Sequence, residues 1–144
     1  MPADMHPDGQ PEVTAEDLGF DEVSIPTATA FGLLRVSALL SEEMDRELQE
    51  SAGMGLSEML VLIQLMLAGG RLRMAELANT LVVTRGGVTK IVDRLTDEGL
   101  VERVPSTSDR RVVYAQVTDD AKAVVRKYQP QFDARTGDLA GVEA

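Results

Sequence analysis

The chain has 144 residues, of which 44% are hydrophobic and 26% charged, and its formal net charge is −10. This length fits one domain that buries roughly two-thirds of the unfolded chain's surface. No apolar run reaches the roughly 20 residues of a transmembrane helix, and the lack of cysteine excludes disulfides, thiolate metal sites and thiol-based redox sensing. The N-terminus has no basic region followed by an apolar core, so we expect no signal peptide, no membrane partner and a cytoplasmic location.

The acidity is concentrated at the N-terminal end of the chain. Residues 1–55 carry 2 basic and 12 acidic side chains, residues 56–117 carry 8 and 7, and residues 118–144 carry 4 and 5. Because charges are screened over about 8 Å at physiological salt, local clusters matter more than the sum. Residues 1–23 are rich in Pro, Gly, Asp and Glu, which predicts a disordered acidic tail.

The segment 24–52 follows a helical pattern over about six turns. Ser24 or Thr27 can cap its start, and Gly53 ends it. The residues expected on its buried side are Leu33, Leu34, Ala38, Leu40, Met44 and Leu48.

A second helix is predicted from residue 56, with Ser57 as its cap and Gly69-Gly70 at its end. Its expected apolar face consists of Leu60, Ile63 and Leu67. Residues 72–74 are predicted to be extended, in a segment too short to stand alone.

Residues 74–81 and the segment from Thr84 onward predict two helices joined by a tight turn. In the second helix the apolar residues recur at helical spacing, which indicates one buried face: Val88, Ile91, Val92 and Leu95. The other face carries side chains suited to phosphates and base edges: Arg85, Thr89, Lys90 and Arg94.

Gly99 is expected to end this basic helix, and two alternating runs follow at residues 100–104 and 112–117. They predict a β-hairpin whose tip carries Arg110 and Arg111. We expect one of these arginines to enter a narrow minor groove and the other to pair with Asp109 and fix the turn, and the sequence does not decide which. A basic helix followed by a basic hairpin indicates a winged helix-turn-helix that binds duplex DNA.

A last helix is predicted from Thr118, which caps it ahead of two acidic residues. Pro130 is expected to kink this helix or end it. Its apolar stripe is predicted to consist of Ala121, Val124, Val125 and Tyr128. The fold class is therefore mainly α with a small β-hairpin wing.

These elements resemble the MarR family of bacterial transcription regulators over roughly residues 56–121. The resemblance rests on the run from Arg94 to Arg103, on the Asp109-Arg110-Arg111 triplet and on the step from Val117 to Thr118. It implies a homodimer that binds a pseudo-palindromic operator, acts as a repressor and is released by a small aromatic or lipophilic ligand. It also implies one domain over residues 24–144, with a dimerisation helix (24–52), a DNA-binding region (56–117) and a shortened C-terminal dimerisation helix (118–144).

Two features depart from that family pattern. The family continues into a further C-terminal helix, whereas this chain ends at residue 144 and residues 136–141 are poor helix formers. We therefore expect a weaker dimer that depends on the helix at residues 28–51. Gly86 and Gly87, in the first turn of the basic helix, cost about 1–2 kcal/mol relative to alanine, but they permit close approach of a phosphate to the helix N-terminus next to Thr84.

Other functions find little support in the sequence. No nucleophile–base pair and no glycine-rich phosphate loop after a strand can be assembled, so an enzyme is not expected. A single histidine and no cysteine make a zinc site improbable, and we expect no cofactor. Met59 and Met66 are candidates to line an effector pocket, although filling core gaps is the commoner role of methionine. The alternative function is a winged-helix module that binds another protein and binds DNA weakly or not at all.

Overall fold

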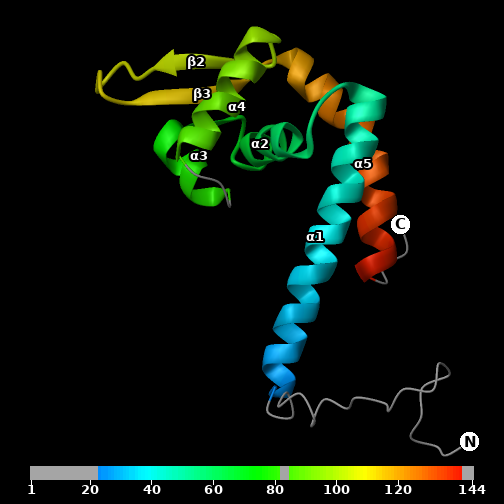
Figure 1. Ribbon diagram of the computed structural model, residues 1–144. Coiled ribbons are helices and arrows are strands. Elements are labelled where there is room, and N and C mark those ends of the chain that lie inside the picture. Colours follow the sequence, from blue (N-terminus) through cyan, green and yellow to red (C-terminus); the bar gives the residue numbers. More distant parts are fainter. Residues whose placement is uncertain (1–22, 82–84, 141–144) are drawn as a thin grey trace, which may run out of the picture. The chain divides into compact units, whose positions relative to one another are not determined.

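The computed structural model describes residues 23–81 and 85–140 and divides the chain into two compact units, residues 1–40 and 41–144. The predicted tail at residues 1–23 thus lies almost wholly outside the described residues and stays a prediction. The elements, in chain order and as labelled in Figure 1, are α1 (Ile25–Ala52), α2 (Leu56–Leu67), β1 (Arg71–Arg73), α3 (Met74–Thr80), α4 (Arg85–Asp97), β2 (Val101–Pro105), β3 (Val113–Val117) and α5 (Asp119–Ala140). The predicted fold class, mainly helical with a small β wing, is confirmed.

The sheet in the described part of the chain has three antiparallel strands in the order β1-β3-β2. The predicted hairpin forms β2 and β3, with Val101 opposite Val117 and Pro105 opposite Val113. The short extended segment before α3 becomes β1 because it pairs with β3, where Leu72 lies opposite Ala115. A strand of three residues is stable here only because β3 satisfies its backbone groups.

The core of the second unit is formed where α2, α3, α4 and α5 meet the sheet. The predicted inner face of α4 is confirmed, since Val88, Val92 and Leu95 are at most 1% exposed. Ala121, Val125 and Tyr128 of α5 are also buried. Each such side chain, if fully buried, contributes about 1.5–3 kcal/mol when it is as large as Val or Leu. This core holds the inner side of α4 against the rest of the unit.

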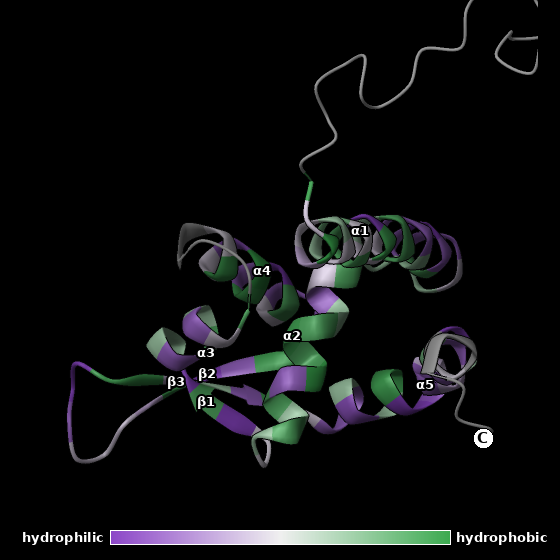
Figure 2. Ribbon diagram, turned by 90° about the horizontal axis from the view of Figure 1, so that it is seen from below, coloured by the Kyte–Doolittle hydropathy of each residue, from purple (hydrophilic) through white to green (hydrophobic). Residues whose placement is uncertain are grey.

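The predicted cap of α2 is wrong, and its predicted face is wrong at two of three positions, since only Ile63 is partly buried against the core. Leu60 and Leu67 are 41% and 79% exposed, whereas Leu62 and Leu65 are fully buried. Nearly every position of this helix is apolar, so its periodicity does not reveal which side meets the core (Figure 2). The N-cap is Gly55 rather than Ser57, because the Glu58 carboxylate accepts a hydrogen bond from the Gly55 backbone nitrogen at 3.1 Å.

The predicted buried side of α1 is confirmed in only one part of the helix. Met44 and Leu48, which belong to the second unit, are buried, but Leu33 and Leu34 in the first unit are 68% and 71% exposed. An apolar pattern predicts that a helix surface will be buried, but it does not show whether the residues that bury it belong to the same chain. The other large exposed hydrophobic residues at positions 25–39 are Ile25, Phe31, Val36 and Leu39.

The helix α5 continues through Pro130 to Ala140, so of the two expectations at Pro130, a kink or an end, the end does not occur. Thr118 caps its start, since the Thr118 hydroxyl accepts a hydrogen bond from the Ala121 nitrogen at 3.3 Å. The Tyr128 hydroxyl donates to the Ser51 carbonyl oxygen at 2.9 Å. Within the second unit this tertiary contact joins α5 to the end of α1, close to Pro130, which cannot donate a backbone hydrogen bond.

Candidate nucleic-acid interface

The outer face of α4 presents polar and basic side chains. Thr89 and Lys90 are exposed, and Lys90 lies on the side opposite the buried Val88 and Val92. Within the described residues, Lys90 has no ion-pair partner. Thr84 lies outside the described residues. Arg85 and Gly86 begin α4, and Gly87 is half-buried in its first turn.

Gly99 ends α4 and directs the chain into the hairpin. Its φ of 73° lies in the left-handed region, which other residues adopt only with strain. The Leu100 nitrogen donates to the Leu95 carbonyl oxygen at 2.8 Å, which closes the last helical turn. The predicted stop at Gly99 is thereby confirmed, and β2 begins two residues later at Val101.

Arg94 has an ion-pair partner on another helix that could not be identified from the sequence. Its guanidinium forms an ion pair with the carboxylate of Glu58 on α2. The Glu58 side chain is 4% exposed and that of Arg94 is 65% exposed. The spacing of Gly55 and Glu58 is that of a capping box and could have indicated the cap, but the burial of Glu58 and its contact with α4 depend on the tertiary fold.

A second ion pair holds α4 on its other side. The Arg103 guanidinium on β2 lies 2.6 Å from the Asp93 carboxylate, and the two side chains are 36% and 53% exposed. Consecutive residues of α4 therefore connect it to two different elements, α2 through Arg94 and β2 through Asp93.

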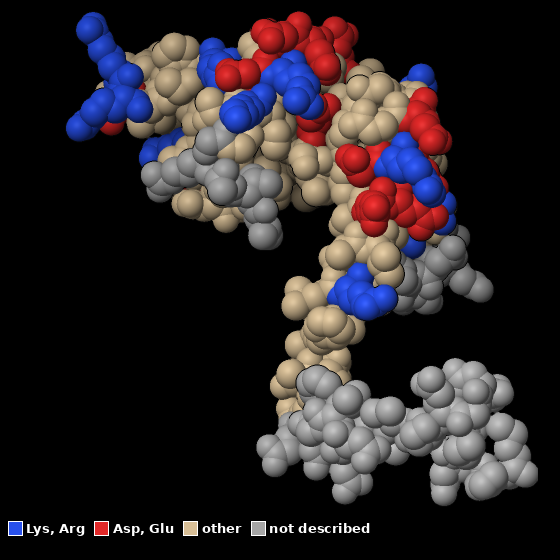
Figure 3. All heavy atoms as spheres, in the orientation of Figure 1, with Lys and Arg blue, Asp and Glu red and all other residues tan. Residues whose placement is uncertain are grey.

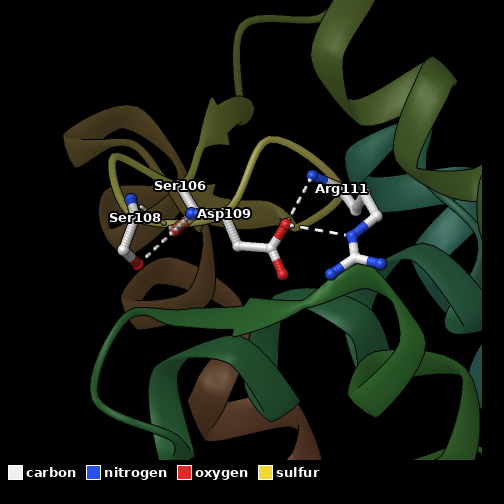
Figure 4. A network of polar contacts seen from close by, with 4 residues as sticks. All are labelled: Ser106, Ser108, Asp109 and Arg111. Carbon is white, nitrogen blue, oxygen red and sulfur yellow. Dashed lines mark hydrogen bonds and ion pairs between the residues drawn. The ribbon is translucent and has the colours of Figure 1, made fainter.

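The loop between β2 and β3 is closed by short-range polar contacts (Figure 4). The Ser106 hydroxyl accepts hydrogen bonds from the nitrogens of Ser108 and Asp109, both at 3.3 Å. The Asp109 carboxylate accepts from the Arg111 backbone nitrogen at 3.0 Å and from its side-chain Nε at 3.3 Å. Arg110 is exposed and has no ion-pair partner among the described residues. Of the two arginines at the tip, Arg111 is the one that fixes the turn.

Two arginines on β1 were missed by the sequence analysis. The Arg71 guanidinium lies 4.7 Å from the centre of the Tyr114 ring, a cation–π contact. A hydrogen bond with the Tyr114 side chain raises the pKa of Arg73. Tyr114 lies on β3, 41 positions beyond Arg73, so only the strand pairing brings these side chains together.

Basic side chains are unevenly distributed over the visible surface of the second unit. Figure 3 shows Lys and Arg at the far end of the hairpin, and others over α4 that alternate with acidic side chains. In residues 23–81 and 85–140 no group of three or more His, Asp or Glu side chains could hold a metal ion. No single helix in those ranges is long and apolar enough to cross a membrane.

A cavity of about 530 Å³ lies between α2 and α5. Its lining includes Met59 and Met66, the two methionines singled out in the sequence, together with Val125 and Phe132 of α5. The lining is mainly apolar, with Gln129 and Asp133 as its polar members. Met59 is nevertheless 1% exposed and belongs to the core, so it combines a packing role with a position at the cavity wall.

Comparison with known proteins gives a consistent result. A family model described as MarR family matches residues 52–112. The uncharacterised HTH-type transcriptional regulator YkoM of Bacillus subtilis is 30% identical over 117 residues, which cover 78% of this chain and 73% of YkoM. The HTH-type transcriptional regulator FarR of Neisseria gonorrhoeae is 31% identical over 74 residues, which cover 51% of each chain.

The solved structures agree with these matches. The crystal structure of Sco3205, a MarR family transcriptional regulator from Streptomyces coelicolor in complex with DNA, has 30% sequence identity and a TM-score of 0.70. The match covers 81% of this chain and 74% of Sco3205. The predicted resemblance is thereby confirmed, and the prediction that the chain is not an enzyme agrees with it. The chain belongs to the MarR family of winged-helix transcription regulators.

Proposed function

We propose that this regulator is a cytoplasmic repressor that binds a pseudo-palindromic operator as a homodimer. The DNA-binding surface is supported by one observation. Two exposed basic side chains, Lys90 on α4 and Arg110 at the wing tip, belong to elements whose inner sides pack in the same core. Neither cation has an ion-pair partner among the described residues. Each is available to a DNA phosphate or base.

In this proposal α4 enters the major groove and the hairpin reaches the adjacent minor groove. Thr89 and Lys90 face base edges, while the first turn of α4, from Arg85 to Gly87, approaches a phosphate. Arg110 enters the minor groove, because Asp109 engages Arg111.

The homodimer is supported by the apolar part of α1. From position 25 to 39 the large hydrophobic side chains are 50–83% exposed and lie around most of the helix circumference. A helix that is apolar on nearly all sides is stable only when it is enclosed. A second copy of the chain offers the same apolar helix, so the two can cover each other around a two-fold axis.

The dimer is tested by Leu34→Asp, with Arg35→Asp as the matched control next to it. Leu34 is 71% exposed in the single chain, so the substitution is expected to leave the second unit folded while it shifts the sedimentation mass from dimer to monomer. The control should keep the dimer. A dimer that survives Leu34→Asp and Leu39→Asp together would contradict the assignment of residues 25–39 as the dimer contact.

Release of DNA by a small lipophilic ligand is supported by the cavity between α2 and α5, which has the volume and apolar lining of ligand pockets. Filling it should mimic or block the ligand. Ile63 lines the cavity, so the larger side chain of Ile63→Trp should fill it and abolish any response of DNA affinity to lipophilic compounds. Leu60→Trp, on the same helix but away from the lining, is its control.

DNA recognition is tested on a duplex enriched from a random library by the wild-type protein. Lys90→Ala should weaken binding to this duplex by about 1–3 kcal/mol and leave the melting temperature unchanged, since the side chain is exposed. Arg126→Ala, on the exposed side of α5, is the control and should bind as the wild type does. Failure to enrich any duplex, together with unchanged binding by Lys90→Ala, would favour the protein-interaction module instead.

A further inference from the structure

Glu58 is the single buried charged residue among those described, with 3% of the whole residue exposed. Its two carboxylate oxygens have different partners. One accepts a hydrogen bond from the Gly55 nitrogen at 3.1 Å, and the other forms the ion pair with Arg94 on α4. A buried carboxylate is tolerated only when it is paired and hydrogen-bonded, and both conditions depend on these two contacts.

The apolar contacts of α4 do not by themselves fix its rotation about its own axis. Val88, Val92 and Leu95 form one stripe, and burial of apolar surface is not directional. A small roll about this stripe would cost little buried area. An ion pair has a required distance and direction, so the contact of Arg94 with Glu58 specifies one rotation among several of similar burial.

That rotation matters for the residues proposed to read DNA. Lys90 precedes Arg94 by four positions, and side chains four apart lie on the same side of a helix. A change in the position of Arg94 therefore moves Lys90 with it. The pair of Asp93 with Arg103 holds the other side of α4 more weakly, because both its members are substantially exposed to solvent.

We propose that Glu58 is a positioning residue that sets the recognition helix through Arg94 and so determines sequence selectivity, without contact to DNA. The inference rests on the proposal that α4 reads DNA. It assigns Arg94 a role different from the phosphate contact that the sequence suggested: its guanidinium is a tether to α2, and the DNA phosphates are left to other cations. Loss of the tether should then reduce discrimination between DNA sequences more than general affinity for DNA.

The test compares Glu58→Gln, Arg94→Gln and Arg94→Lys with the wild type, and uses Arg103→Gln as the matched control on the other side of α4. Affinity is measured for the enriched duplex and for a random duplex of equal length, at several salt concentrations. Urea unfolding of each variant identifies the conditions under which it is fully folded. Arg94 is largely exposed, so its variants keep the proposal testable if Glu58→Gln does not fold.

Glu58→Gln and Arg94→Gln should each lower the affinity for the enriched duplex by about tenfold, the loss expected for one misplaced base contact. Affinity for random DNA and the salt dependence should stay as in the wild type. Arg94→Lys should recover most of the selectivity, because it retains a cation facing Glu58. Arg103→Gln should change neither affinity by more than about twofold, in keeping with a solvent-screened pair.

Two results would overturn the inference. If Arg94→Gln weakens both duplexes equally and makes the salt dependence shallower while Glu58→Gln has no effect, Arg94 contacts phosphate directly. If Glu58→Gln lowers the free energy of unfolding but keeps the full selectivity, Glu58 has only a structural role. Either result leaves the proposed function intact as long as Lys90→Ala still loses affinity. If the proposed function itself is wrong, the wild-type protein should bind the enriched and the random duplex with equal affinity.

Discussion

Arg110 and Arg111 are neighbours at the wing tip, yet their surroundings differ. The Arg111 side chain is 91% exposed, but its Nε and its backbone nitrogen both donate to Asp109. Arg110 has no such contact among the described residues, so its guanidinium keeps all its donors for an external acceptor. At this scale the structure resolves the choice that the sequence left open about Asp109.

We predict that Arg110→Ala affects DNA preference directly, whereas Arg111→Ala acts through the shape of the turn. Arg110→Ala should relax the preference for A·T pairs flanking the central site, because a narrow minor groove attracts an inserted guanidinium. Competition binding with duplexes that differ only in A·T or G·C flanks measures this. Arg111→Ala and Asp109→Asn should weaken all these duplexes by a similar, smaller factor. A larger loss of flank preference in Arg111→Ala than in Arg110→Ala would reverse the assignment.

At the scale of elements, α5 is connected to α1 within the second unit by one basic residue. Arg135 forms an ion pair with Glu43 at 3.1 Å and with Glu47 one turn further along α1. The hydrogen bond from Arg135 is the main cause of a lowered pKa at Glu47. The stabilisation from Glu47 is therefore complete above its unfolded pKa, near 4.5, and is lost as the pH falls through the lower folded value.

Urea unfolding of the wild type and of Glu47→Gln, followed as a function of pH, measures this contribution to stability. At pH 7 the variant should be less stable, since it lacks the charge that faces Arg135. The difference should shrink as the pH falls below 4.5, the ordinary pKa, and through the lower folded pKa at which the wild-type carboxyl becomes protonated. Glu50→Gln, exposed on the same helix, serves as control and should follow the wild type throughout. A stability difference that does not shrink at any pH below 4.5 would show that the charge of Glu47 contributes nothing.

The buried face of a helix was predictable from the sequence where the helix carries a single apolar stripe that packs against other segments of the same chain. The inner faces of α4 and α5 were predicted correctly because each carries one narrow apolar stripe that packs in the second unit. The face of α2 was predicted wrongly because its apolar residues continue around the helix. Contacts between distant segments, such as Glu58 with Arg94 and Tyr114 with Arg71, leave no periodic pattern and could not be predicted.

The surroundings of Glu58 and of the cavity next to it also depend on contacts between distant segments. Glu58 and Met59 are consecutive on α2, and they face α4 and the cavity respectively. A ligand that displaces Met59 would thus act on the segment that holds Arg94. The sequence singled out Met59 as a candidate pocket residue, but it gave no sign that Glu58 is buried against α4, because that contact is formed by a helix from a later part of the chain.

For the whole molecule the distribution of charge is the dominant feature. The net charge of −10 would repel DNA if it were spread evenly, but residues 56–117 carry 8 basic and 7 acidic side chains. Several of those acidic groups are already engaged, as Glu58 is by Arg94 and Asp93 by Arg103. The excess acidity lies in residues 1–55, and residues 1–22 alone contain 7 acidic and no basic side chains.

The last prediction separates this acidic segment from the DNA-reading surface. A dimer that makes about six to ten phosphate contacts should lose affinity with a slope of roughly −5 to −9 in log–log plots against salt concentration. Deletion of residues 1–22 should tighten binding at low salt to the enriched and the random duplex by the same factor, because it removes long-range repulsion without touching α4 or the wing. Selectivity should therefore stay constant.

The control for the deletion is a full-length variant with the 7 acidic residues of this segment changed to Asn and Gln, which keeps its length. If charge is the cause, this variant should behave as the deletion does, and both should converge with the wild type above about 0.5 M salt, where the screening length falls to about 4 Å. A deletion that alters selectivity while the neutral variant does not would show that these residues affect DNA reading by contact. Unchanged affinity of both at low salt would instead mean that the acidic segment stays too far from the DNA to repel it.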